Sequence, residues 1–450
     1  MSIPARSRGS ALARARGSYA AKHILLPVQK FIHTETSSGI VLLAAAAIAL
    51  LWANSRWSVT YEHFWNLGAL VGVGPFGLSH TLREWVNDAL MVLFFFVVGI
   101  EVKREFVHGE LSDRKRASLP VAAALGGMVV PAALYAVLNA GTPTQHGWGI
   151  PMATDIAFAL GVLALLADRV PAQLRIFLLA LATVDDIGAI LVIALFYSGQ
   201  LSLGALVAAA ALLLVMFGMW RIGIHRLMYY LPFATVFWFA VFSSGIHATI
   251  AGVVLGLMVP TSAQLSRRRY VDDAEPLMKD LKAAVHAGER ERSDSILGQV
   301  EELTSGTESP ADRLLRLLHP WSGYFVLPIF ALANAGVTIT AASAWKAFAS
   351  PEARGVIVGL GVGKLIGIAL FGYLAVKTRM ASMLSGVRWS QMAGVALLGG
   401  IGFTVSLFIT DLAFTNATNV NNAKAAVLLV SGLSGAAGYI FLRVTYQRLG

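Results

Sequence analysis

The dominant feature of this sequence is a series of apolar stretches, each nearly long enough to cross a lipid bilayer as a helix. A spanning helix needs about 20 mostly apolar residues. By this criterion we predict an all-α membrane protein with about twelve transmembrane helices. The stretches lie at residues 37–54, 84–104, 118–139, 148–167, 173–197, 203–219, 228–243, 247–260, 321–338, 354–376, 390–413 and 423–445.

The composition excludes an ordinary soluble protein. Hydrophobic residues make up 56% of the 450 residues and charged residues only 13%, whereas soluble domains carry about 25% charged residues. The chain has no cysteine, so disulfides and thiolate metal sites are excluded. The net charge of +10 reports membrane topology rather than nucleic-acid binding, because the basic residues gather in particular loops.

The distribution of lysine and arginine predicts the orientation of the chain. Basic residues crowd the cytoplasmic loops of membrane proteins. Here they precede the first apolar stretch and follow every second one, whereas 140–147 and 198–202 have none. We therefore expect both termini in the cytoplasm. The basic residues that support this orientation are Lys103, Arg104, Arg114, Lys115, Arg116, Arg169, Arg175, Arg221, Arg226, Arg267, Arg268, Arg269, Lys377, Arg379, Arg388, Arg443 and Arg448.

Three segments lie outside the apolar stretches. Residues 1–36 are basic and contain almost no acid; we interpret them as a cytoplasmic tail, although such a start is also typical of transit peptides. Glycine and proline between apolar residues in 55–83 favour a short periplasmic β-hairpin. The polar loop at 262–316, partly helical around 274–303, has too little apolar content for its own core. Residues 37–450 are thus expected to form one transmembrane domain, with the loop at 262–316 in the cytoplasm.

Four ionisable residues lie in the middle of apolar stretches: Asp155, Asp185, Asp186 and Lys364. Charges at such depth are costly and usually functional. They could instead form structural salt bridges, but three acids against one base leave carboxylates that need a cation or a proton. A carboxylate in a medium of low dielectric binds a proton more readily than in water, and Na⁺ is a hard cation suited to oxygen ligands. Competition between Na⁺ and a proton for one site that is exposed to alternate sides of the membrane is sufficient for exchange.

The two adjacent aspartates cannot have the same role. Neighbouring residues of a helix point about 100° apart, so Asp185 and Asp186 face different ways. We expect one of them to line the ion site and the other to face a neighbouring helix, where Lys364 is the obvious partner.

Two of the predicted spans carry the residues of an interrupted helix. Pro151 and the Thr154-Asp155 pair lie in the fourth span, and three glycines lie within 399–402 of the eleventh. Non-helical backbone at that depth occurs where it lines a cavity or is buried in protein. Helix ends in such a break carry partial charges, which Asp155 and Lys364 would offset. Close helix packing is the alternative explanation of the glycines.

Small residues also recur in the tenth span, beside Lys364. Their spacing of four residues places them on one face and indicates close contact with another helix. The residues are Gly355, Gly359, Gly363 and Gly367.

At these positions the sequence resembles the NhaA family of bacterial Na⁺/H⁺ antiporters, over most of the chain from about residue 30 onward. The resemblance is carried by WVNDALMVLFFFVVGIEVKRE (85–105), PMATDIAFALGVLALL (151–166), LATVDDIGAI (181–190), SSGIHATIAGV (243–253), LHPW (318–321), FALANAGV (330–337), GKLIGIALF (363–371) and GGIGFTVSLFI (399–409). An ordered set of this kind is far more specific than any one of its motifs.

The resemblance implies a role for each residue of the site. Asp186 is implied as the principal ligand of the transported metal ion, which alternates with a proton. Asp185 is implied as the partner of Lys364, with Thr154 near the ion. Asp155 lies between the broken helices.

The resemblance also implies the activity. It is electrogenic, pH-regulated export of cytoplasmic Na⁺, and also of Li⁺, in exchange for external protons, which serves sodium and pH homeostasis without a cofactor. It further implies an inverted repeat containing the two broken, crossed helices, and a homodimer formed through the hairpin at 55–83.

Five further residues are candidates for the ion pathway or for pH sensing: Asp88, Glu101, Glu105, His247 and His319. Ordinary interface charge is an equal alternative for the two glutamates, and a satisfied core histidine for His247. Just before the HPW sequence, Leu315 and Arg316 replace the glutamate and histidine that the family often carries there.

Two other functions fit the sequence less well. A Na⁺-coupled symporter of an organic anion would need basic groups in its pocket, whereas carboxylates dominate here. An intramembrane aspartyl protease would use two carboxylates as acid and base, but it would give Lys364 no role. We therefore expect a transporter and not an enzyme.

Overall fold

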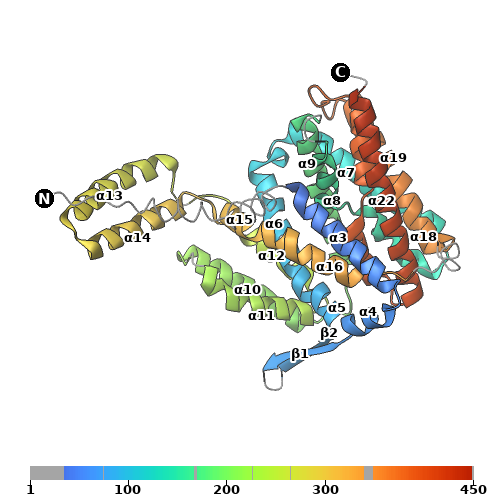
Figure 1. Cartoon of the computed structure of the whole chain (residues 1–450), viewed down its shortest axis with the longest axis horizontal. Coiled ribbons are helices and arrows are strands. Elements are labelled where there is room, and N and C mark those ends of the chain that lie inside the picture. Colours follow the sequence, from blue (N-terminus) through green and yellow to red (C-terminus); the bar gives the residue numbers. More distant parts are fainter. Residues whose placement is uncertain are drawn as a thin grey trace.

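A computed structural model describes residues 35–73, 76–166, 170–224, 227–263, 265–338 and 348–447. These residues are mostly helical, with one two-stranded sheet (Figure 1). The predicted tail at 1–36 lies almost wholly outside the described residues, as do Arg169, Arg226 and Arg448.

The elements follow one another with short connections. In chain order they are α3 (Glu35–Ala53), α4 (Ser58–Trp65), β1 (Gly68–Val73), β2 (Phe76–Thr81), α5 (Leu82–Trp85), η2 (Val86–Leu90), α6 (Met91–His108), η3 (Glu110–Ser112), α7 (Arg114–Leu138), η4 (Pro143–Met152), α8 (Ile156–Ala164), α9 (Ala172–Phe196), α10 (Leu203–Arg221), η5 (Leu227–Tyr229), α11 (Tyr230–Ser243), α12 (Thr249–Met258), α13 (Arg267–Ala287), α14 (Arg290–Gly306), α15 (Pro310–Trp321), η6 (Ser322–Val326), α16 (Leu327–Asn334), α18 (Pro351–Val356), η7 (Ile357–Gly363), α19 (Lys364–Lys377), α20 (Trp389–Gly399), α21 (Phe403–Ala413) and α22 (Ala417–Gln447).

The apolar helices support a multi-pass membrane protein. Among the described residues, six helices are long and apolar enough to cross a membrane, and three bent helix pairs raise this number to nine. Two shorter apolar helices lie at Leu227–Ser243 and Thr249–Met258. Many large apolar side chains on these helices are exposed, for example Leu195 at 72% and Leu214 at 71%. A membrane would cover such side chains, since exposed apolar area is unfavourable in water.

The predicted hairpin is present. Strands β1 and β2 pair antiparallel, with Gly68 opposite Thr81 and Val73 opposite Phe76. Helix α5 follows directly, and the Thr81 hydroxyl accepts a hydrogen bond from the Glu84 backbone N–H in a capping box. This arrangement fixes the start of the long helical span that continues through α6.

The polar loop is more helical than predicted. Helices α13 and α14 form a hairpin that extends away from the other helices (Figure 1), and they exceed the expected 274–303 at both ends. The residues added at the start include three arginines, which are good helix formers. Gly288 ends α13 with a φ of +77°, in the region that glycine adopts without strain.

The glycine stripe of the tenth span makes the predicted close contact. Helix α19 packs on α7, and a Cβ atom added at Gly367 would collide with the backbone of Gly126. Glycine is therefore required at this crossing.

We expect Gly367→Ala to force α7 and α19 apart and to destabilise the protein by about 1–3 kcal/mol, the usual cost of overpacking. Thermal unfolding in detergent would measure it. Gly204→Ala is the matched control, because a Cβ atom there meets nothing within 4 Å. Equal melting temperatures for the two variants would contradict the requirement for glycine.

Candidate functional site

The fourth and eleventh spans are interrupted, as predicted. The helices η4 and α8 bend by 42° and the helices α20 and α21 by 43°, each at a break of a few residues. The two breaks lie against each other, since the Asp155 backbone N–H donates to Ile401 O at 2.6 Å. Irregular backbone is tolerated here because it is buried in protein.

Asp155 lies at the N-terminal ends of α8 and α21, the second helix of each bent pair. Its Oδ1 accepts a hydrogen bond from the Phe158 backbone N–H at 2.9 Å. Its Oδ2 accepts two from Thr404, at 3.1 Å from the backbone N–H and at 2.6 Å from the hydroxyl. The side chain is only 2% exposed. Helix N-termini carry partial positive charge, so one carboxylate compensates two of them.

Lys364 pairs with Asp185 in the same region. Its Nζ contacts Asp185 Oδ2 and lies 3.0 Å from the Thr154 hydroxyl. The Thr154 hydroxyl lies 2.5 Å from Asp185 Oδ2 and 2.9 Å from Gly399 O. Both charged side chains are fully buried. Lys364 is thus linked through Thr154 to the C-terminal end of α20, whose carbonyl carries partial negative charge.

Asp186 differs from Asp155 and Asp185 in the contacts of its carboxylate. It is 5% exposed, and we find no hydrogen bond or ion pair from any other described residue to its carboxylate. Within the described part of the chain, Asp185 Oδ1 is a fully buried oxygen without a hydrogen-bond partner. Buried polar atoms without partners are rare and costly. The arrangement therefore offers oxygen atoms that a cation or a proton would satisfy.

Asp88 and His247 lie together beside the hairpin end of the span. Asp88 Oδ1 is 3.5 Å from His247 Nε2, and His247 Nδ1 is 3.0 Å from the Thr249 hydroxyl. The imidazole also packs edge-on against Phe408 of α21, with ring centroids 5.1 Å apart. Asp88 belongs to the π-helical segment η2, and such segments often occur at functional sites.

The remaining candidates lie toward α15, at the other end of α6. Glu101 Oε1 is 3.5 Å from His319 Nε2, while Glu105 Oε1 accepts the Glu110 backbone N–H at 2.7 Å. The His319 side chain is 62% exposed. Thirteen residues of one helical span separate Asp88 from Glu101, about 20 Å along its axis. These two pairs of candidates therefore lie far apart from each other along one helical span.

The sequence did not reveal a second ion pair that involves a buried lysine. Lys424 Nζ lies 2.7 Å from Asp411 Oδ1, and Lys424 is 5% exposed. Both residues stand near the ends of predicted spans, where a charge is ordinarily attributed to the membrane surface. Their burial depends on neighbouring helices, which the sequence pattern does not report.

Known proteins resemble this chain over nearly its whole length. The sequence profile of the family described as "Na+/H+ antiporter 1" matches residues 29–442. The Na⁺/H⁺ antiporter NhaA 2 of Syntrophotalea carbinolica is 45% identical over 92% of this chain and 96% of that protein. The Na⁺/H⁺ antiporter NhaA of Oleidesulfovibrio alaskensis is 44% identical over 94% of each chain, and that of Wolinella succinogenes is 42% identical over 96% of this chain. This chain belongs to the Na⁺/H⁺ antiporter 1 family.

Proposed function

We propose that this chain exchanges Na⁺ for H⁺ across the bacterial inner membrane, at a site centred on Asp186. It is a transporter and not an enzyme, and the ions are its cargo, so no cofactor takes part. The observation that carries the site assignment is the Asp186 side chain, which is 5% exposed and has no hydrogen-bond or ion-pair partner among the described residues, beside two carboxylates that are already compensated.

The charges of the site support this assignment. Asp155 is compensated by two helix N-termini and by Thr404, and Asp185 is compensated by Lys364. Only Asp186 remains, and an unpaired buried charge is strongly unfavourable. Either a proton or a metal cation removes that penalty, so the two compete for one carboxylate. Asp185 Oδ1 and the Thr154 hydroxyl are the nearby oxygens that we assign to the bound Na⁺.

The two interrupted helices supply the means of alternating access. Broken helices that meet near the middle of a membrane are typical of transporters with inverted repeats, whose site opens to one side at a time. We propose that η4–α8 and α20–α21 form such a crossed pair in a fold of about twelve spans. Electrogenic exchange, transport of Li⁺ and cytoplasmic termini belong to the same proposal.

The two outlying pairs mark the ends of the proposed pathway. Asp88 with His247 lies on the hairpin side, and Glu101 with His319 lies on the α15 side. Each pair sets a carboxylate against an imidazole, so these pairs are our candidates for pH regulation. We further propose that the β1–β2 hairpin joins two copies of the chain, because its antiparallel edge strands can pair with another copy.

The exchange is tested with purified protein in liposomes that carry an imposed pH gradient. Addition of Na⁺ should collapse the gradient, and addition of choline at the same ionic strength should not. The assay should be run from pH 6 to pH 9, with an uptake assay for organic anions in parallel. Na⁺-dependent anion uptake without any change of the gradient would contradict the proposal and favour a symporter.

A milder prediction concerns the capping of α21. Thr404→Val removes the hydroxyl that donates to Asp155 and keeps the backbone N–H that also donates. Loss of one hydrogen bond to a charged group costs about 1.5–3 kcal/mol, so we expect a lower melting temperature and retained, weaker exchange. Thr410→Val is the control, because its hydroxyl donates only within α21, to Ser406 O. A larger loss of stability in the control would contradict the assignment.

A further inference from the structure

The partly buried ion pair of Lys424 and Asp411 belongs to a polar cluster outside the ion site. Lys424 of α22 donates to both carboxylate oxygens of Asp411 in α21, at 2.7 and 2.9 Å, and lies 3.3 Å from Asn334 Oδ1 in α16. Asn334 in turn donates to Asn87 Oδ1 in η2 at 2.8 Å. We call these four residues the Lys424 cluster. It connects α21 and α22 to α16 and η2.

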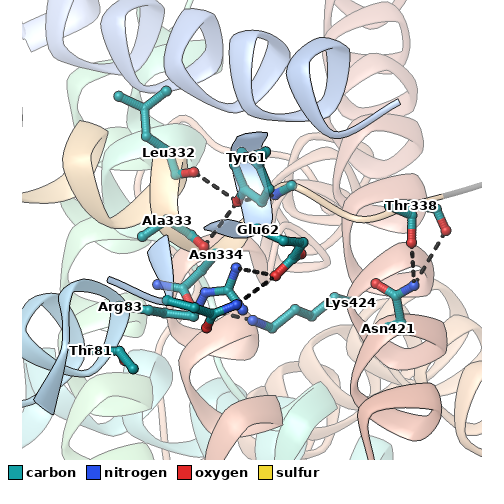
Figure 2. Close-up of polar contacts among 12 residues, drawn as sticks. Tyr61, Glu62, Thr81, Arg83, Leu332, Ala333, Asn334, Thr338, Asn421 and Lys424 are labelled. Carbon is teal, nitrogen blue, oxygen red and sulfur yellow. Dashed lines mark hydrogen bonds and ion pairs between the residues drawn. The ribbon is translucent and has the colours of Figure 1, made fainter. Parts of the chain in front are cut away.

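Neighbouring contacts hold the same region together. Figure 2 shows them beside Asn334 and Lys424 of the cluster. The Tyr61 hydroxyl of α4 lies 2.9 Å from Leu332 O and 3.0 Å from Ala333 O, at the end of α16. Arg83 of α5 lies 3.3 Å from Glu62 Oε2. The short helices that flank the hairpin are thus tied to the segment that contains Asn334.

The position of the cluster relative to the ion site is defined by α21. Thr404, at the start of α21, binds Asp155 in the ion site. Asp411 lies seven residues later on the same helix, about 10 Å farther along its axis. Asn87 directly precedes Asp88, on the hairpin side. The cluster therefore lies between the ion site and the hairpin side, at the far end of a helix that begins in the ion site.

The chemistry of the cluster suits a contact that forms and separates. A buried ion pair adds little stability compared with apolar side chains of similar size, so stability alone does not explain it. An apolar contact that opens exposes hydrophobic area to water, which is costly. Polar partners that separate into water are instead hydrated, because water replaces each lost hydrogen bond. The contacts of the cluster are therefore stable while water is excluded, and they separate at a low cost in free energy once water enters.

We propose that the Lys424 cluster is a latch that closes the hairpin side of the ion site and separates whenever the site opens to that side. The proposal rests on the exchange function proposed above. Lys424 and Asp411 are positioning residues and do not bind the transported ion, since they contact neither Asp186 nor Asp185 in the structure. Removal of the latch should favour the conformation that is open on the hairpin side.

The test is the double variant Lys424→Ala with Asp411→Ala, which removes both charges, leaves no lone buried ion and leaves no large apolar side chains that could form a contact in place of the ion pair. The apparent affinity of a site scales with the fraction of protein in the binding-competent conformation. We therefore expect the apparent KM for Na⁺ to fall several-fold when Na⁺ is added on the hairpin side, and to rise several-fold when it is added on the α15 side. The orientation of the protein in liposomes is measured by labelling Ser79→Cys in the hairpin, because the chain has no native cysteine.

A second measurement does not depend on transport. Met91 is fully buried and lies one helical turn beyond Asn87, so Met91→Cys reports access from the hairpin side. A small membrane-impermeant thiol reagent should label it about tenfold faster in the latch variant than in the otherwise unchanged chain. Unchanged labelling would overturn the latch. Faster labelling in a chain that exchanges no Na⁺ would support the latch and overturn only the proposed function.

Asn422→Ala is the matched control for both measurements. Asn422 lies two residues from Lys424 on α22 and donates to Glu352 Oε1 of α18 at 2.8 Å, so its loss perturbs the same helix without touching the cluster. We expect no opposite shift of the two KM values and no faster labelling in this variant. Similar effects in the control and the latch variant would show a general loosening of α22 and overturn the proposal.

Discussion

Asp186→Asn is expected to abolish Na⁺-driven proton movement while the protein still inserts and folds. The amide is close in size to the carboxylate, but it neither titrates nor carries the charge that holds a cation. Since Asp186 makes no hydrogen bond or ion pair with another described residue, removal of its charge breaks no contact. A lone buried charge is unfavourable, so the melting temperature should stay the same or rise.

The measurement is collapse of a pH gradient by Na⁺ in liposomes, with thermal unfolding of the same preparation in detergent. We expect at least a hundredfold loss of the exchange rate, about 2.7 kcal/mol. Asp312→Asn is the matched control, because that carboxylate is half exposed and faces Arg104 at 3.6 Å, away from the ion site. Exchange at the wild-type rate in Asp186→Asn would refute the assignment of Asp186 as the ion ligand.

Lys364→Ala is expected to cause the largest loss of stability. The substitution leaves the fully buried Asp185 carboxylate without its cation, and the loss of one partner of a buried pair costs about 3–5 kcal/mol. Thr154 keeps a single hydrogen bond to that carboxylate, which does not replace the charge. The melting temperature in detergent should fall clearly below that of the unchanged chain.

The dependence of this loss on pH has a definite sign. At low pH the stranded Asp185 takes up a proton and becomes neutral, so the penalty of the single variant should be smallest there. As pH rises the carboxylate must ionise in a buried place, and the difference in melting temperature from the unchanged chain should grow. The double variant Lys364→Met with Asp185→Leu should recover most of the stability at all pH values, although it disrupts the site. A single variant as stable as the unchanged chain at every pH would show that the pair is not a structural support.

Local features of the sequence were sufficient for much of the fold. Runs of about 20 apolar residues indicate membrane helices regardless of their neighbours, because the bilayer itself selects them. The breaks in the fourth and eleventh spans were also predictable, since proline and clustered glycines disfavour a regular helix at any place in a chain. The hairpin followed from glycine and proline between apolar residues.

Other features were decided only by tertiary contacts. The residues themselves left open which of two adjacent aspartates faces Lys364. The structure places Asp185 there, through contact between residues 179 positions apart. The π-helical segments before Lys364 and around Asp88 had no signal in the apolar pattern, because a single widened turn leaves the composition unchanged.

The sequence by itself determined where charge enters the membrane, where the spanning helices break, and that the acids outnumber the base. Only the tertiary structure decided which acid has no partner among the described residues, that Asp155 accepts hydrogen bonds at two helix N-termini, and that Lys424 is buried beside Asp411. The physical reason is the separation along the chain over which each effect acts. Hydrophobicity and helix breaking act within a few residues of the chain, whereas the compensation of a buried charge depends on groups brought beside it from distant parts of the chain.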